Sequence, residues 1–103
     1  MPGHQVTCIS RTHSEGSHED ITHIGNFTQG WRMNRNEAIR LIDSKLHKFY
    51  VVDANNITSP IDVVREEGKP PYLRSHIDGK WNDNMLSLTE CPRQRLYFGY
   101  LPS

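Results

Sequence analysis

The sequence has little of what marks a membrane, secreted or phosphate-binding protein. None of its apolar runs approaches the ~18 residues that a membrane-spanning helix needs, and residues 1–5 lack the charged and apolar stretches that begin a signal peptide. The seven glycines are scattered, so the chain has no glycine-rich loop of the kind that binds nucleotide phosphates. We therefore expect a cytoplasmic protein that does not enter a membrane.

The chain also lacks an excess of charge of either sign. Its twelve basic and twelve acidic residues cancel to a formal net charge of zero. Proteins whose main task is to grip nucleic acid or an anionic membrane rely on summed positive charge. The balance of charge therefore argues against both tasks and allows only weak nucleic-acid binding.

Cysteine is scarce. The chain has only Cys8 and Cys91, and neither belongs to a Cys-x-x-Cys motif. In a reducing compartment two such residues are more often thiols than a disulfide. We therefore predict that both are buried, close together and reduced. A disulfide between them is the alternative, and it requires an oxidising compartment.

The residues that are present indicate one small domain. A chain of 103 residues with 35% hydrophobic side chains can bury a single modest core. Runs that favour extended backbone, bounded by turn residues, predict strands over residues 5–12, 21–27, 49–53, 60–65 and 72–77. The polar stretch 13–20 around Gly16 predicts a hairpin loop between the first two strands.

One helix is predicted over residues 35–47. Asn34 is a good N-cap residue, and Glu37 follows three residues later, as in a capping box. Apolar side chains then recur at helical spacing, and basic residues gather near the far end, where they suit the helix dipole. The predicted core joins this helix to the strand that follows it and consists of Ile39, Ile42, Leu46, Phe49 and Val51.

The predicted fold class is α+β. Residues 1–92 form a single domain with the order strand, strand, helix, strand, strand, strand, in which the helix packs on one face of an antiparallel or mixed sheet. The closing stretch 83–92 ends on Cys91 and is expected to fold back toward the first strand.

Residues 93–103 form a separate apolar tail. Leu96, Phe98 and Tyr100 lie in a segment that is apolar on both faces, so it has to be covered. We expect it to add a strand to its own sheet or to pair with a second copy of the chain.

Several short pieces of the sequence together resemble a known family. They are Thr7-Cys8-Ile9, Ile21 to Gly25, Trp31, Glu37-Ala38-Ile39 and the closing Leu86-Ser87-Leu88 followed by Cys91-Pro92. In their order and spacing over residues 5–92 they resemble a family of small bacterial and phage proteins known only as a domain of unknown function. The Leu-Ser-Leu-x-x-Cys-Pro run is the most specific part. The resemblance implies a single bacterial-type domain and supplies no catalytic residues.

One candidate site is a cluster of Cys8, His23 and Cys91. If the first hairpin closes around Gly16, Cys8 falls opposite His23 and both point to the same face of the sheet. Cys91 joins them if the closing segment crosses that face. These are ligand types that zinc takes, and Cys8 beside His23 is also the minimum for a thiol nucleophile. The bland alternative is that both cysteines are small buried hydrophobic residues.

A second candidate site is basic. Arg32, Arg35 and Arg40 lie on or beside the predicted helix, near an aromatic side chain at Trp31. Basic charge with aromatic stacking is typical of nucleic-acid surfaces. Arginines on the outer face of a helix also commonly do no more than keep it solvated.

The function that the residues favour is binding without catalysis. No nucleophile, base and orienting group are evident together, so we expect a non-enzymatic domain that needs no cofactor and binds another protein or a second copy of itself. The alternatives are a small zinc- or thiol-dependent enzyme and a weak nucleic-acid-binding accessory protein.

Overall fold

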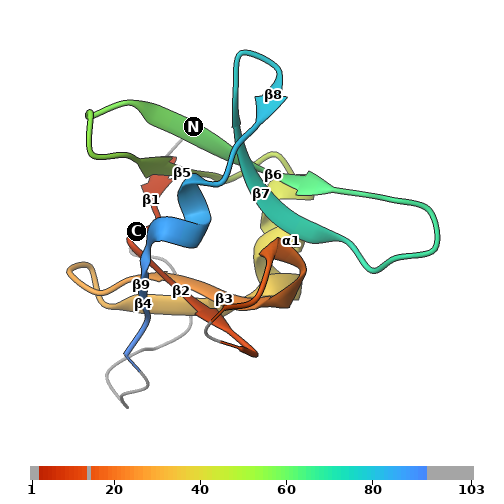
Figure 1. Ribbon diagram of the computed structural model, residues 1–103, viewed down its shortest axis with the longest axis horizontal. Helices are drawn as coiled ribbons and strands as arrows, with labels where there is room; N and C mark the ends of the chain where they lie inside the picture. Colours follow the sequence, from red (N-terminus) through yellow and green to blue (C-terminus); the bar gives the residue numbers. More distant parts are fainter. Residues whose placement is uncertain (1–2, 14, 93–103) are drawn as a thin grey trace.

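The chain folds into two sheets that face each other, with one α-helix at one end of the space between them (Figure 1). A computed structural model describes residues 3–13 and 15–92. Strands account for 44% of the structure and helical residues for 18%. The predicted fold, a single sheet with a helix on one face, is wrong, because the strands form two sheets. The described residues do contain one α-helix, as predicted.

The first sheet has five strands in the order β1-β5-β6-β7-β8. They are β1 (Gly3–Gln5), β5 (Lys48–Val52), β6 (Thr58–Val64), β7 (Tyr72–Ile77) and β8 (Lys80–Trp81). β1 lies parallel to β5, and the remaining neighbours are antiparallel. The sheet is therefore mixed, and its central strands are β5, β6 and β7.

The second sheet has four strands in the order β4-β3-β2-β9. They are β4 (Trp31–Asn34), β3 (Ile21–Asn26), β2 (Cys8–Arg11) and β9 (Thr89–Glu90). β9 pairs in parallel with β2, which confirms that the closing segment folds back toward the start of the chain. A short 3-10 helix, η1 (His18–Asp20), precedes β3, and another, η2 (Asn84–Ser87), precedes β9.

The two sheets arise because the chain changes partners between neighbouring residues. The N–H of Val6 donates to the carbonyl of Tyr50 in β5, at 2.8 Å, whereas the N–H of Thr7 donates to the carbonyl of Gly25 in β3, at 2.9 Å. The single strand predicted over residues 5–12 is thus two strands, one in each sheet. The residues before the helix were not predicted as a strand, but they form β4, which pairs with β3 from His23↔Asn34 to Asn26↔Trp31.

The core fills the space between the sheets. Ile9, Ile24 and Met33 lie opposite one another on three adjacent strands of the second sheet and are all buried. Trp31 has no exposed surface and joins the same cluster. The first sheet contributes Phe49, Val51, Ile61 and Leu73, and the helix contributes Ala38 and Ile39.

The helix α1 (Arg35–Asp43) is four residues shorter than predicted. It begins as expected, because the side chain of Asn34 accepts a hydrogen bond from the N–H of Glu37 at 2.8 Å. It ends early because Ser44 bonds back to the carbonyl of Leu41 through its hydroxyl, at 2.7 Å, and Lys45 takes a left-handed backbone conformation with φ of 63°. The chain then turns directly into β5.

The early end of the helix corrects one core assignment. Ile39, Phe49 and Val51 are buried together, as predicted, and Ile42 is partly buried. Leu46 lies beyond the helix in the turn before β5 and is 67% exposed, so its placement in the core is wrong. Helical spacing in the sequence continued past the point where the backbone left the helix.

Other predictions fall on residues that are not described. The tail residues Leu96, Phe98 and Tyr100 lie outside the described residues, so the division of the chain at residue 92 and the self-association role of the tail stay predictions. Within the described part of the chain, no helix combines the length and the apolar character needed to cross a membrane.

A buried histidine in η1 lies beside Asp83, the residue directly before η2. His18 is 6% exposed, and its Nε2 lies 3.9 Å from the Oδ1 of Asp83. Burial lowers the pKa of His18 below its ordinary value of 6.5, and the positive charges of Arg74 and Arg11 lower it further, while Asp83 acts in the opposite direction. The folded protein therefore favours the neutral ring.

Because of His18, the domain is expected to become less stable as the pH falls. Its pKa is lower in the folded than in the unfolded chain, so the unfolded chain binds the proton first as the pH falls. The stabilisation is complete above about pH 6.5 and is lost as the pH falls through the lower, folded pKa. Urea unfolding at pH 7.5 and pH 5.5 should show a smaller fall in the free energy of unfolding for His18→Gln than for the wild type. The exposed His13 in the same connection is the control, and an equal effect of His13→Gln would contradict the assignment.

Candidate functional site

The described structure has a pocket of about 530 Å³ between the end of α1 and the first sheet. We call it the α1–β5 pocket. Its lining residues come from the end of the helix, the turn that follows, and strands β5, β6 and β7: Ile42, Lys45, His47, Lys48, Phe49, Pro60, Ile61, Asp62 and His76. Volumes of a few hundred cubic ångströms with an apolar lining are typical of ligand and side-chain recognition sites.

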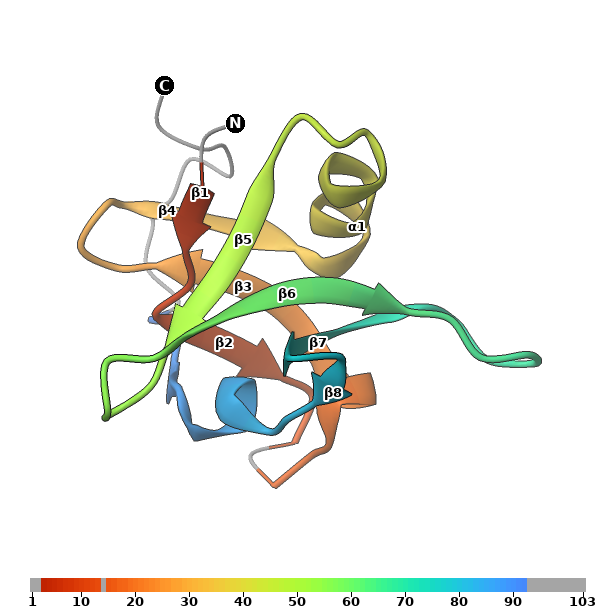
Figure 2. The ribbon, with the colours of Figure 1, turned by 90° about the horizontal axis from the view of Figure 1, so that it is seen from above.

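The pocket exists because β5 and β6 separate. β5 pairs only with the first part of β6, from Val52↔Thr58 to Phe49↔Ile61. Beyond Ile61 the strand β6 continues alongside β7, as far as Val64↔Tyr72. Figure 2 shows β5 and β6 diverging from their paired ends, with α1 lying between their separated ends. The pocket lies at the edge of this wedge, where its lining residues Pro60 and Ile61 are the last of β6 to pair with β5 and Asp62 follows them.

The charged groups around the pocket do not cancel. Among the described residues, neither Lys45 nor Lys48 takes part in an ion pair. The one carboxylate in the lining, Asp62, accepts a hydrogen bond from the N–H of Val63 at 2.9 Å and lies 3.8 Å from the Nε2 of His76. The pocket therefore carries two lysines and only one carboxylate, and that carboxylate already contacts Val63 and His76.

A pair of histidines holds one wall of the pocket. The Nε2 of His4 in β1 and the Nδ1 of His47 lie 3.1 Å apart, so one ring nitrogen donates its proton to the other. His4 is 7% exposed and packs against the rings of Trp31 and Phe49. Burial lowers the pKa of His4, and His47 lowers it further. The contact attaches the turn after α1 to β1 and limits how far that wall can move.

Exposed apolar side chains flank the opening. Leu46, between two lining residues, is 67% exposed. Trp81 is 45% exposed and packs edge to face against His76, with ring centroids 5.5 Å apart. Single exposed apolar residues are ordinary on protein surfaces. Two of them beside the same apolar pocket suggest that a partner covers them.

The lining combines an apolar surface with several polar groups. In the described structure it contains no hydroxyl and no thiol side chain. It offers apolar surface at Ile42 and Pro60, ammonium groups at Lys45 and Lys48, and the imidazole of His76 beside the carboxylate of Asp62.

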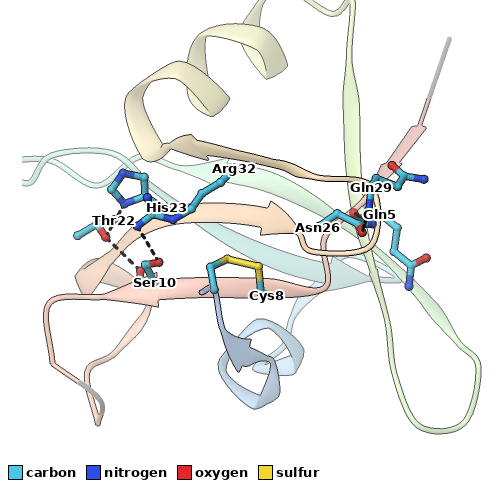
Figure 3. The surroundings of a disulfide bond; sticks show 9 residues. Gln5, Cys8, Ser10, Thr22, His23, Asn26, Gln29 and Arg32 are labelled. Atoms are coloured by element: carbon cyan, nitrogen blue, oxygen red, sulfur yellow. Dashed lines mark hydrogen bonds between the residues drawn. A yellow bond between two sulfur atoms is a disulfide. The ribbon is translucent and has the colours of Figure 1, made fainter. Parts of the chain in front are cut away.

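The cysteine cluster predicted from the sequence is assembled differently (Figure 3). Cys8 and Cys91 form a disulfide with their Cα atoms 4.8 Å apart, so the prediction of two reduced thiols is wrong. Cys8 lies opposite Gly25, and His23 lies opposite Ser10, two residues further along β2. The 3-10 helix η1 and an irregularity between Ser10 and Arg11 shift the register that was assumed for the hairpin.

His23 is on the predicted face of the sheet but in another network. Its Nδ1 lies 2.9 Å from the hydroxyl of Thr22, which donates to the carbonyl of Ser10 at 3.3 Å (Figure 3). The two sulfur atoms are bonded to each other rather than presented to a metal ion beside His23. Within residues 3–13 and 15–92, no group of three or more histidine, cysteine, aspartate or glutamate side chains is arranged to hold one.

A glycine makes room for the disulfide. A Cβ atom on Gly25 would lie 3.2 Å from each of the two sulfur atoms and 2.8 Å from the carbonyl oxygen of Trp31. A glycine inside a strand commonly marks such a close approach. Gly25, inside the strand predicted over residues 21–27, is therefore the feature of the sequence that indicates this close approach.

The three predicted nucleic-acid residues have different surroundings. Arg32 donates to the hydroxyl of Ser10 at 3.1 Å, and Arg35 donates to the carbonyl of Glu19 at 3.1 Å. Arg40 lies exposed on α1. Two of the three guanidinium groups therefore hold elements of the fold together, and binding of nucleic acid by these residues stays a prediction.

The α1–β5 pocket was not predicted from the sequence. Lys45, His47 and Lys48 were interpreted as the basic end of a longer helix, and His76 as part of a strand. The pocket depends on where β5 leaves β6 and on the early end of α1. The first is decided by pairing between distant strands and the second by the Ser44 hydroxyl and the left-handed Lys45, so neither follows from the spacing of apolar residues.

The chain is a small two-sheet domain with a pocket beside its helix and a disulfide between β2 and the residue after β9. Residues 5–89 match the family described as Protein of unknown function (DUF3892), and the chain belongs to that family. This confirms the predicted membership of a family of unknown function. No curated protein and no solved structure matches the chain. The matched residues end before Cys91, so the specificity of the closing motif and a bacterial or phage origin stay predictions.

Proposed function

We propose that this domain is a non-enzymatic binding module that recognises another protein through the α1–β5 pocket. The observation that carries the proposal is an apolar pocket flanked by two exposed large side chains, Leu46 and Trp81. Tryptophan is enriched among the residues that dominate binding energy in protein interfaces. A partner that places a side chain in the pocket would cover both exposed residues at the same time.

The two alternatives, a zinc- or thiol-dependent enzyme and a nucleic-acid-binding protein, have less support. A zinc or thiol enzyme built on Cys8, His23 and Cys91 needs separate thiolates, whereas the two sulfur atoms are joined. A nucleic-acid surface needs Arg32 and Arg35 free to reach phosphates, whereas each donates to an atom of this chain. Self-association through the tail rests on residues outside the described part of the chain and adds nothing to the case for the pocket.

The cellular location of the protein decides whether the disulfide persists, but the proposed binding does not depend on it. The sequence predicts a cytoplasmic protein, and disulfides persist mainly in oxidising compartments. In the cytoplasm Cys8 and Cys91 would be reduced for much of the time. The pocket does not contain either cysteine, so the proposed binding applies in both compartments as long as the domain stays folded.

Site-specific photo-crosslinking in the native host tests the proposal. A photoreactive phenylalanine analogue replaces Leu46 in one version of the full chain and Phe27 in the control version. Phe27 is also exposed, at 51%, but it lies in the turn between β3 and β4. We expect a discrete crosslinked protein from position 46 that is absent from position 27.

A pocket-filling change makes the result specific. Ile42 lines the pocket and is only partly buried, so Ile42→Trp is expected to fill the cavity and to abolish the crosslink from position 46. Thermal unfolding checks that this variant still folds. The same crosslinked proteins at both positions, or a crosslink that survives Ile42→Trp in a folded protein, would refute recognition through the pocket.

A further inference from the structure

The α1–β5 pocket also indicates what kind of protein segment enters it. We infer that the partner segment is an acidic peptide in which one apolar side chain is flanked by carboxylates. This inference rests on the proposed function and goes beyond it by naming the chemistry of the partner.

The ion pairs near the pocket leave its two lysines without an acidic partner among the described residues. Asp43, at the end of α1, is the acidic residue nearest in sequence to Lys45, and it is bound by Arg65. Asp62 faces His76 and accepts from the backbone of β6. The carboxylates on these elements are therefore engaged, while no ion pair among the described residues includes Lys45 or Lys48. Two ammonium groups are left to attract negative charge.

The two lysines lie at either end of a short connection between α1 and β5 that the fold holds in place. The N–H of Lys45 donates to the carbonyl of Ile42 at 3.0 Å, which keeps the turn against the end of the helix. Two residues later His47 is attached to His4 in β1 at 3.1 Å. Lys48 begins β5, where it lies opposite Gly3. A fixed backbone lowers the entropy that binding has to overcome, because only the lysine side chains remain to be ordered.

An apolar surface lies between the charged groups of the pocket. Ile42 and Pro60 line the cavity together with the edges of Phe49 and Ile61. This surface can bury an apolar side chain, and it offers no hydrogen bonds to a phosphate or a sugar. Leu46 and Trp81 extend the apolar area beyond the cavity, which favours a peptide segment over a small anion.

The tail of the same chain does not meet these requirements. Its apolar residues follow Arg93 and Arg95, so it would bring positive charge to two lysines. An acidic segment of another protein satisfies the charge and the apolar surface together. Attraction between opposite charges acts mainly on the rate of association and on the choice of partner.

Selection from a random peptide library tests the inference. A phage-displayed library of twelve-residue peptides is selected against the full-length folded protein, in parallel with two variants. In the pocket variant, Lys45→Glu/Lys48→Glu, the two pocket charges are reversed. In the control variant, Arg40→Glu/Lys69→Glu, the same total charge is changed at exposed residues that neither line the pocket nor adjoin Leu46 or Trp81.

We expect the wild type to enrich peptides with an apolar residue flanked by aspartate or glutamate. Their affinity, measured by fluorescence polarisation with the labelled peptide, should fall at least about tenfold for the pocket variant, which corresponds to about 1.4 kcal/mol. The control variant should bind within about a factor of three of the wild type, since exposed distant charges act only weakly through salt solution. The pocket variant should itself enrich basic peptides.

The outcomes separate this inference from the proposed function. Peptides that lose binding with Ile42→Trp but show no excess of acidic residues, and bind the pocket variant as tightly, would overturn the acidic partner and leave protein recognition standing. A library without any peptide sensitive to Ile42→Trp would overturn both. Twelve-nucleotide single-stranded DNA is the remaining probe, and binding of it that depends on Lys45 and Lys48, with no peptide enriched, would assign the charges to nucleic acid instead.

Discussion

Removal of the disulfide with Cys8→Ala/Cys91→Ala is expected to lower the free energy of unfolding by about 2–5 kcal/mol. The cross-link joins residues 83 positions apart, so its loss frees nearly the whole unfolded chain. It also holds a segment with little pairing of its own, because β9 has only two residues and meets β2 at Cys8↔Thr89 and Ile9↔Glu90. The measurement is urea unfolding of the oxidised wild type and the variant under the same conditions.

Reduction of the wild type is the matched control for the disulfide. A reducing agent should lower the stability of the wild type by a similar amount and leave the alanine variant unchanged. This separates the loss of the cross-link from the loss of sulfur packing beside Gly25. A wild type with unchanged stability after reduction, verified by a count of two free thiols, would show that β9 and η2 hold the closing segment without the disulfide.

Asn82→Ala is expected to cost about 2–3 kcal/mol, although asparagine in a loop usually contributes little. The Oδ1 of Asn82 accepts hydrogen bonds from the hydroxyl of Ser75 and, at 3.1 Å, from the N–H of Asn84. Its Nδ2 donates to the hydroxyl of Ser59 at 3.2 Å. Both serines have no exposed surface, so the removal of Asn82 leaves buried polar groups without this partner.

Two comparisons test the buried network around Asn82. Asn55→Ala changes an exposed asparagine in the turn between β5 and β6 and should alter stability by less than about 0.5 kcal/mol. Ser75→Ala in the Asn82→Ala background should recover part of the loss, because replacing both partners of a buried hydrogen bond is nearly neutral. Strictly additive losses for the two substitutions would contradict the network. Chemical denaturation of the wild type, the three single variants Asn82→Ala, Asn55→Ala and Ser75→Ala, and the double variant provides the comparison.

Local features of the sequence predicted local structure well. The N-cap at Asn34 and the strands near residues 21–27, 49–53 and 72–77 are present, because each depends on neighbouring residues only. The return of the closing segment to the start of the chain was also predicted and is confirmed by the pairing of β9 with β2. The family was recognised from ordered short pieces, which a match over residues 5–89 confirms.

The errors have two physical causes. The strand predicted over residues 5–12 divides at Val6 and Thr7, because their N–H groups find acceptors in different sheets. The helix ends before Leu46, because the Ser44 hydroxyl bonds back to the carbonyl of Leu41 and Lys45 takes a left-handed backbone conformation. The first cause acts between distant segments and the second within one turn, and hydrophobic periodicity records neither.

The sequence by itself determined the class of local elements, the family, and the excess of apolar residues that must be buried. Only the tertiary structure decided that there are two sheets, that Cys8 meets Cys91 across Gly25, and that a pocket opens beside α1. Spacing along the chain records which residues share a face of one element. It does not record which distant strand accepts a given N–H group, and that choice sets the register, the number of sheets and the wedge between β5 and β6.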